Sequence, residues 1–167
     1  MKQKLLYILI ILFFLSTSSF SKNLKFTKII DLDKPWGSSF INSNELIVTE
    51  KSGKLKIINI ENNHVNEIEH NLNFLEYGQG GLLDIIYKDG FIWISYTEDR
   101  GNSKTSTSIA RGKLDRKKIF FENIFQANPP IDSGYHFGSR LIIKGNYIFA
   151  SLGERGQGMI AQDFTSH

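Results

Sequence analysis

One pattern recurs three times along the chain and constrains its fold more than any other feature. Each copy has a glycine that opens a short apolar strand, a Gly or Asn turn, a second apolar strand ending in Ser or Thr, and a glutamate before a Gly turn. The copies run from Trp36 to Gly53, from Gln79 to Gly101 and from Phe137 to Gly156. Their opening glycines, Gly37, Gly81 and Gly138, are 44 and 57 residues apart. A period of this length, with room for four short strands, is typical of a β-propeller blade.

The rest of the sequence after Lys22 also predicts an all-β protein. Short β-branched and aromatic runs alternate with Gly, Asn and Asp turns, and helical periodicity is almost absent. The expected strands are Leu24–Ile30, Glu45–Glu50, Lys54–Ile60, Val65–Glu69, Leu82–Tyr87, Phe91–Thr97, Ser106–Lys113, Ile119–Phe125, Arg140–Ile143 and Tyr147–Leu152. A β-sandwich is the alternative fold, because it too has short strands and glycine turns. A sandwich gives no reason for the repeated order, so the repeat favours the propeller.

The length of the chain conflicts with a closed propeller. Without the 21 residues of the N-terminal segment described next, the 167-residue chain keeps 146 residues, which is close to three blades. Propellers close with roughly four to eight blades. We therefore expect residues 22–167 to form the N-terminal half of a longer propeller domain, with an uncovered apolar flank where the next blade would stack.

The N-terminus is typical of a secretory signal peptide. Two lysines precede the apolar run Leu5–Leu15, and Ser19 and Ser21 occupy the −3 and −1 positions of a cleavage site before Lys22. A membrane anchor is the alternative, but a spanning helix needs roughly 20 apolar residues, and the end of this segment is mostly Ser and Thr. We expect residues 1–21 to be removed, no membrane span to remain, and the protein to be periplasmic or secreted.

Charge and composition exclude several classes of function. The formal net charge is +3, and loss of the two lysines of the signal peptide leaves 18 basic against 17 acidic residues. No basic surface for a nucleic acid is therefore expected. The absence of cysteine suits an exported chain and removes the usual structural zinc sites. The histidines lack metal-ligand spacing, and no Gly-x-Ser-x-Gly motif, P-loop or supported dinucleotide fingerprint is present.

Three residues are expected to converge at one rim of the propeller channel, because the residues just before each innermost strand lie there. They are Trp36, Gln79 and His136, one from each copy. An imidazole can take a proton from a hydroxyl, and an amide can donate to and accept from a sugar hydroxyl. Each residue also has a structural alternative: a tryptophan that packs, a glutamine that caps backbone groups, and a histidine bonded in a blade turn. Together they predict a site for a polar ligand.

Several segments, in order, resemble one protein family. They are PWGSSF (35–40), ELIVTEKSGKLKII (45–58), GQGGLLDI (78–85), ISYTE (94–98), IARGKLD (109–115), YHFGSRL (135–141), SLGERG (151–156) and AQD (161–163). The sequence is similar to the soluble aldose sugar dehydrogenases that depend on pyrroloquinoline quinone (PQQ), also called the glucose/sorbosone dehydrogenase family. These segments cover nearly the whole chain after residue 22.

The resemblance implies a six-bladed propeller with PQQ over the channel mouth and bound calcium. It implies that His136 is the general base that deprotonates the C1 hydroxyl of an aldose while the C1 hydride passes to the quinone, and that Gln79 contacts the sugar. In the glucose-specific branch an aspartate precedes the histidine, whereas Tyr135 stands here. This sequence is therefore closer to the broader aldose-oxidising branch. The residues that clamp PQQ and bind calcium are expected beyond residue 167, so no metal ligand is assigned in this chain.

The expected function is therefore oxidation of aldoses to lactones, with electrons passed to an external acceptor and no nucleic-acid partner. The chain alone is expected to be inactive, because the cofactor clamp lies outside it. Two alternatives remain: a non-catalytic secreted propeller that binds a glycan or a protein, and a calcium-dependent propeller lactonase. The lactonase would place acidic metal ligands at the rim positions that Trp36, Gln79 and His136 occupy.

Overall fold

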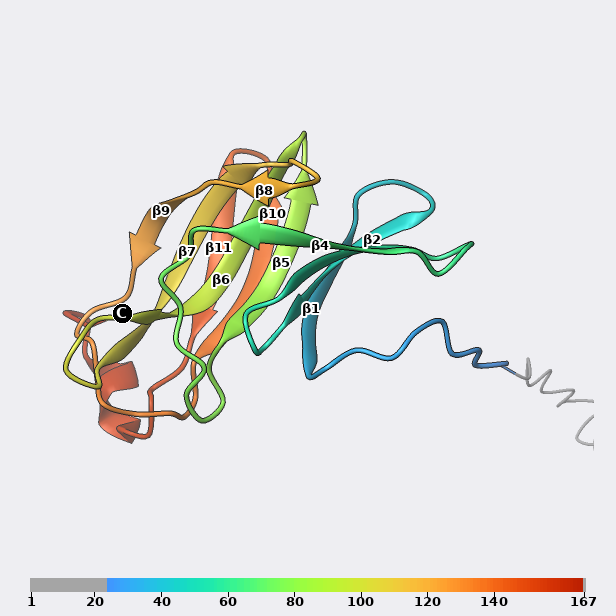
Figure 1. Cartoon of the computed structure of the whole chain (residues 1–167). Coiled ribbons are helices and arrows are strands. Elements are labelled where there is room, and N and C mark those ends of the chain that lie inside the picture. The colour runs from blue at the N-terminus through green and yellow to red at the C-terminus, as the bar shows by residue number, and fades with distance from the viewer. Residues whose placement is uncertain (1–23, 167) are drawn as a thin grey trace, which may run out of the picture.

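The computed structural model describes residues 24–166 and is built almost entirely of β-strands (Figure 1). The strands are β1 (Pro35–Phe40), β2 (Glu45–Glu50), β3 (Leu55–Asn59), β4 (Val65–His70), β5 (Leu82–Lys88), β6 (Phe91–Asp99), β7 (Thr105–Lys113), β8 (Lys118–Ile119), β9 (Phe121–Gln126), β10 (Gly138–Lys144) and β11 (Tyr147–Leu152). A short 3₁₀ helix, η1 (Gly158–Gln162), follows the last strand. Within the described range, no helix has the length and apolar character needed to cross a bilayer. The predicted signal peptide, residues 1–21, lies outside the described residues.

The strands form three sheets that follow one another in chain order. The first has the order β1-β2-β3-β4-β8, the second β5-β6-β7-β9 and the third β10-β11. All neighbouring strands are antiparallel except β4 and β8, which are parallel. Strand β5 packs against both β1 and β10, so the first strands of successive sheets are neighbours (Figure 1). This is the radial stacking of propeller blades. The described residues comprise two four-stranded blades and the first two strands of a third, which confirms the propeller prediction over the sandwich.

Two of the expected strands differ in the structure. Residues 24–30 form no strand: no neighbouring strand pairs with them, and Leu24 and Phe26 are 80% and 91% exposed. The expected strand Ile119–Phe125 is divided at Phe120 into β8 and β9. Strand β8 pairs in parallel with β4 of the first blade, whereas β9 pairs with β7 of the second. The break lets one segment reach two blades.

A β-bulge interrupts the first strand of every blade at the same place. The register shifts lie between Pro35 and Ser38, Leu82 and Ile85, and Gly138 and Leu141. In each blade a hydroxyl from the second strand accepts a hydrogen bond from a backbone N–H near the bulge: Gly37 N to Thr49 Oγ1 at 2.9 Å, Asp84 N to Ser95 Oγ at 3.0 Å, and Arg140 N to Ser151 Oγ at 3.0 Å. A Ser or Thr of the second strand thus satisfies a donor that the bulge leaves unpaired.

The same hydroxyls join neighbouring blades. Thr49 Oγ1 donates to the Leu83 carbonyl at 2.6 Å, and Ser95 Oγ donates to the Ser139 carbonyl at 2.7 Å. Both hydroxyl-bearing residues are fully buried. Each hydroxyl therefore closes a bulge in its own blade and holds the first strand of the next blade.

We expect Ser95→Ala to lower the free energy of unfolding by about 1–3 kcal/mol. The substitution leaves the Asp84 N–H and the Ser139 carbonyl without their partner in a buried position. Chemical denaturation with a matched control, Ser43→Ala at an exposed turn, tests this. A loss for Ser95→Ala no larger than that of the control would show that the hydroxyl does not hold the two blades.

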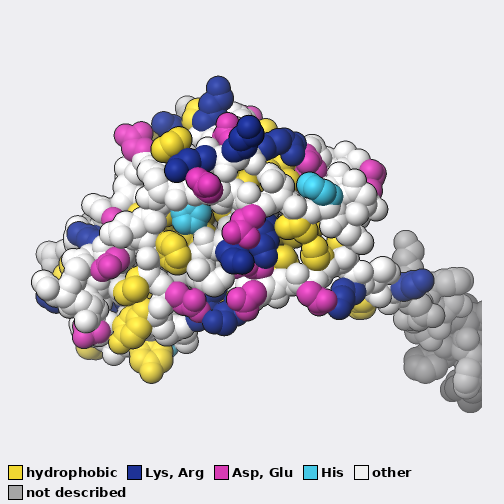
Figure 2. Space-filling model, viewed as in Figure 1, with side chains coloured by type: hydrophobic (Ala, Val, Ile, Leu, Met, Phe, Trp, Pro, Cys, Tyr) yellow, Lys and Arg dark blue, Asp and Glu magenta, His cyan; other side chains and the backbone are white. Residues whose placement is uncertain are grey.

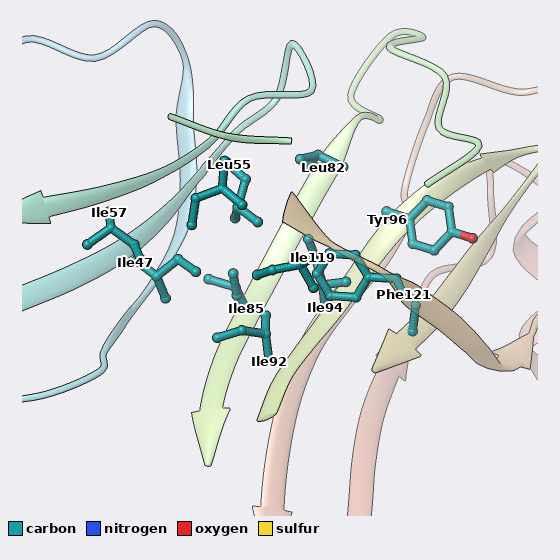
Figure 3. Packing of buried hydrophobic residues seen from close by; sticks show 12 residues of the cluster. Ile47, Leu55, Ile57, Leu82, Ile85, Ile92, Ile94, Tyr96, Ile119 and Phe121 are labelled. Atoms are coloured by element: carbon teal, nitrogen blue, oxygen red, sulfur yellow. The ribbon is translucent and has the colours of Figure 1, made fainter. Parts of the chain in front are cut away.

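The main apolar core lies between the first and second blades. It is formed by Ile47, Leu55, Ile57, Ile68, Leu82, Ile85, Ile92, Ile94, Tyr96, Ala110, Ile119 and Phe121. In Figure 3 the side chains of Ile47 and Ile57 on the first blade face that of Ile85 on the second. On the face of the molecule drawn in Figure 2, basic and acidic side chains are interspersed rather than gathered by sign. That face offers no uniform basic surface to a nucleic acid.

Candidate functional site

Two loops that precede innermost strands lie against each other and carry the predicted site residues. Residues 71–81 lead into β5 and carry Gln79, and residues 127–137 lead into β10 and carry His136. The Gln79 N–H donates to the Gly134 carbonyl at 2.7 Å, and the His136 N–H donates to Gln79 Oε1 at 3.0 Å. A Cβ on Gly78 would lie 2.3 Å from the Gly134 oxygen, so this close approach requires glycine. The structure thus brings Gln79 and His136 together.

The Gln79 side chain has one free end. Because its Oε1 accepts from the His136 backbone, its Nε2 is the end that remains to meet a ligand, and within residues 24–166 it has no hydrogen-bond partner. The two interpretations of Gln79, a cap for backbone groups and a ligand contact, are therefore compatible. The amide oxygen holds the neighbouring loop, and the amide nitrogen can donate to a ligand oxygen.

Trp36 does not share this contact. It lies inside β1 rather than before it and is 50% exposed. In the described part of the chain its side chain makes no hydrogen bond or ring contact with Gln79 or His136. Two lysines next to strands of the first blade contact the loop of residues 71–81 instead: Lys51 Nζ donates to the Gly78 carbonyl, and Lys34 Nζ lies 2.8 Å from Glu76 Oε1.

The His136 ring is fixed at one nitrogen and open at the other. Its Nδ1 lies 2.5 Å from Glu154 Oε1, while its side chain remains 54% exposed. A carboxylate only accepts hydrogen bonds, so Nδ1 carries a proton, and in the neutral ring Nε2 is then the nitrogen that holds the lone pair. Nε2 has no partner among the residues that the structure describes. This tautomer presents a proton acceptor to the solvent-facing side of the loop.

Glu154, at the turn after β11, is the functional residue that the sequence analysis left unassigned. Its Oε2 accepts from the Gly156 N–H at 2.6 Å, and this bond, together with the bond from His136, holds the pKa of Glu154 below its usual value. The carboxylate is therefore ionised at neutral pH. Its negative charge lies beside the His136 ring. It would therefore stabilise the imidazolium that forms when Nε2 takes up a proton.

The residue before the repeated glutamate distinguishes Glu154 from the glutamates of the other two copies. The equivalent glutamates of the first two copies are buried and structural: Glu50 pairs with Lys56 at 2.7 Å, and Glu98 accepts from Ser108 Oγ at 2.6 Å. The residue before the glutamate is threonine in those two copies but Gly153 in the third. A Cβ on Gly153 would lie 1.8 Å from the His136 carbonyl oxygen. Glycine is needed there for the histidine to approach the glutamate.

No set of residues for a metal or for an anionic cofactor is assigned in this site. Residues 24–166 contain no group of three or more His, Cys, Asp or Glu side chains placed to hold a metal ion. The arginines Arg140 and Arg155 are already engaged by groups of the protein. Arg155 donates to backbone carbonyls, and Arg140 lies 3.2 Å from the buried Asp84.

Comparison with known proteins gives matches to one family. A sequence model described as glucose/sorbosone dehydrogenase matches residues 32–167. The aldose sugar dehydrogenase YliI of Escherichia coli K12 is 33% identical over 142 residues, which cover 79% of this chain and 38% of that protein. The crystal structure of the soluble aldose sugar dehydrogenase of E. coli in its apo form superposes with a TM-score of 0.75 at 31% identity, over 81% of this chain and 42% of that one.

A more distant structure supports the fold alone. The PQQ-bound form of an aldose sugar dehydrogenase from Streptomyces coelicolor matches with a TM-score of 0.71 at 20% identity, over 81% of this chain and 42% of that one. The chain thus spans about two fifths of the length of these relatives. Since the family match extends over most of the sequence, the chain belongs to the glucose/sorbosone dehydrogenase family.

Proposed function

We propose that this protein contributes the base and a sugar contact to an enzyme that oxidises the C1 hydroxyl of aldoses to the lactone. The observation that carries the proposal is the state of His136. Its Nδ1 is held by Glu154 at 2.5 Å, its Nε2 has no partner among residues 24–166, and the Gln79 side chain is joined to the same loop. This arrangement is suited to removing a proton from a hydroxyl.

Residues of this chain account for removal of the hydroxyl proton and for part of the orientation of the sugar. Nε2 of His136 takes the proton of the C1 hydroxyl, and the imidazolium that results is stabilised by the adjacent Glu154 carboxylate. Nε2 of Gln79 donates to a sugar oxygen, which orients the ring toward His136. PQQ, when bound, supplies the two-electron acceptor for the C1 hydride.

The described residues suit proton removal and sugar binding, but they do not form a binding site for PQQ. The residues described here offer a base and an amide donor but no unengaged arginine pair for the PQQ carboxylates. We expect the PQQ and calcium ligands in the part of the relatives' length that this chain does not match. The chain alone is then expected to be without turnover. The predicted signal peptide supports export to the periplasm or beyond, where an external electron acceptor takes the electrons.

A dye-linked assay of the full-length protein, meaning this chain with the further length that its relatives have, tests the proposal. Aldose oxidation is expected only when PQQ and calcium are both added, with the lactone as product. Lactone hydrolysis that needs calcium but not PQQ would support the lactonase instead. Sugar binding without turnover would support the non-catalytic propeller. Turnover by the 167-residue chain with added PQQ would contradict its expected inactivity.

A further inference from the structure

One buried cation, Arg155, holds the loop that carries His136. Arg155 is only 7% exposed, and its guanidinium donates to three backbone carbonyls and one hydroxyl. Nε donates to the Tyr135 carbonyl at 3.0 Å and Nη1 to the Thr105 carbonyl at 3.1 Å. Nη2 donates to Thr105 Oγ1 at 2.7 Å and to the Ser133 carbonyl. The guanidinium thus ties the loop to the start of β7.

Arg155 is charged and buried without a carboxylate partner among residues 24–166. The ring of Phe137 lies 3.8 Å from its Cζ, and the ring and the carbonyls together replace the missing negative charge. A buried cation costs free energy unless it is fully hydrogen-bonded, and burial lowers the pKa of Arg155 to about 10. At neutral pH the group is still protonated, so all of its donors are available to the loop.

The bonds of Arg155 act on the residues immediately before His136. The carbonyls of Ser133 and Tyr135 flank Gly134, whose own carbonyl accepts from the Gln79 N–H. Three consecutive carbonyls before the histidine are therefore fixed. His136 itself has a φ of 49°, in the left-handed region that non-glycine residues adopt only when the surroundings hold them there.

We infer that Arg155 is a positioning residue for His136. By fixing the carbonyls of Ser133 and Tyr135, it holds the left-handed backbone that aims the His136 ring at Glu154. Glu154 and Arg155 are adjacent in the sequence, so a single turn after β11 fixes both the ring and the backbone of the histidine. A lysine at position 155 would keep the charge but lose the planar fork that serves three carbonyls at once. The catalytic consequence rests on the proposed function, whereas the placement of the ring does not.

The test replaces Arg155 in the full-length protein by Lys and compares it with Arg111→Lys. Arg111 is a matched control because its guanidinium also lies over aromatic rings, those of Phe91 and Trp93 at 5.0 and 5.3 Å, but outside the site. We expect Arg155→Lys to lower kcat by about 10- to 100-fold with KM changed less than about threefold, because small displacements of a reacting group have effects of this size. Arg111→Lys should retain the parent kcat.

A second readout does not depend on activity. In ¹⁵N NMR spectra the His136 signal, identified by its loss in His136→Gln, should show the Nδ1–H tautomer in the parent and a mixture of tautomers in Arg155→Lys. Thr105→Val removes the hydroxyl that accepts from Arg155 and donates to the Ile131 and Ser133 carbonyls, but it leaves the bonds of Arg155 to the three backbone carbonyls. It should give smaller changes of the same sign, and it can be measured even if Arg155→Lys does not fold. A folded Arg155→Lys variant with the parent tautomer and the parent kcat would overturn the inference. If the parent protein oxidises no sugar, the proposed function fails, while the tautomer comparison still decides the role of Arg155.

Discussion

Replacing His136 by Ala in the full-length protein should lower kcat for aldose oxidation by about 10²- to 10⁴-fold, the range expected for loss of a general base. Nε2 of His136 is the only unbonded imidazole nitrogen that the two interlocked loops present, so no neighbouring side chain there takes over the proton. The His136 backbone N–H still donates to Gln79 Oε1 in the variant, because that bond needs no side chain at position 136. PQQ binding should persist, because the residues that bind PQQ are expected outside the length that this chain matches.

Two further measurements separate loss of the base from loss of the fold. His64→Ala is the matched control, since His64 is exposed and only its backbone is hydrogen-bonded, to Asn59 and Asn62; it should retain the parent kcat. Added imidazole should restore part of the activity of His136→Ala, because the His136 side chain is 54% exposed and its site is open to solvent. An unchanged kcat in His136→Ala would remove His136 from the mechanism.

The blade architecture could be predicted from the sequence because its determinants are local and repeated. The Gly and the Ser or Thr of each copy mark a bulge and the hydroxyl that serves it, as Thr49 and Ser95 show in the first two blades. The strands that were predicted wrongly depend on pairing partners that are distant in the sequence. Residues 24–30 have the composition of a strand but no strand beside them, and the break at Phe120 exists because β8 pairs with β4 of another blade.

The site could be predicted in part for the same reason. The equivalence of the copies placed Gln79 and His136 on loops at one rim, and the structure joins them. The tryptophan was placed by the same rule, but Trp36 already lies within β1, in the bulge between Pro35 and Ser38, so it does not reach the loops. The role of Glu154 depends on the path of an 11-residue loop, residues 127–137, held by Arg155 and Gln79. Repeat patterns do not encode such a path.

The second large effect on kcat is expected for substitution of Glu154. Glu154→Gln removes the negative charge beside the His136 ring and lets the amide present either its oxygen or its nitrogen to Nδ1, so the tautomer is no longer fixed. Loss of such an orienting carboxylate typically costs about 10- to 100-fold, and we expect a fall of this size in kcat. Glu154→Asp keeps the charge but is one methylene shorter, so it should be intermediate. Glu122→Gln, at an exposed position on β9, is the matched control and should be neutral.

The pH dependence distinguishes orientation from a purely structural role of Glu154. Because hydrogen bonds from Gly156 and His136 lower the pKa of Glu154, its ionised form stabilises the site at all pH values above the ordinary range of a glutamate, near 4.5. This contribution is lost only as the pH falls through the lowered pKa. Glu154 therefore does not titrate between about pH 5 and 8, and the acidic limb of the parent kcat/KM profile belongs to other groups. The ratio of kcat/KM in the parent to that in Glu154→Gln should therefore be constant between about pH 5 and 8 and should fall only below about pH 4.5, as Glu154 of the parent is protonated. A ratio that stays constant through the acidic range would mean that Glu154 supports the loop but does not act through its charge.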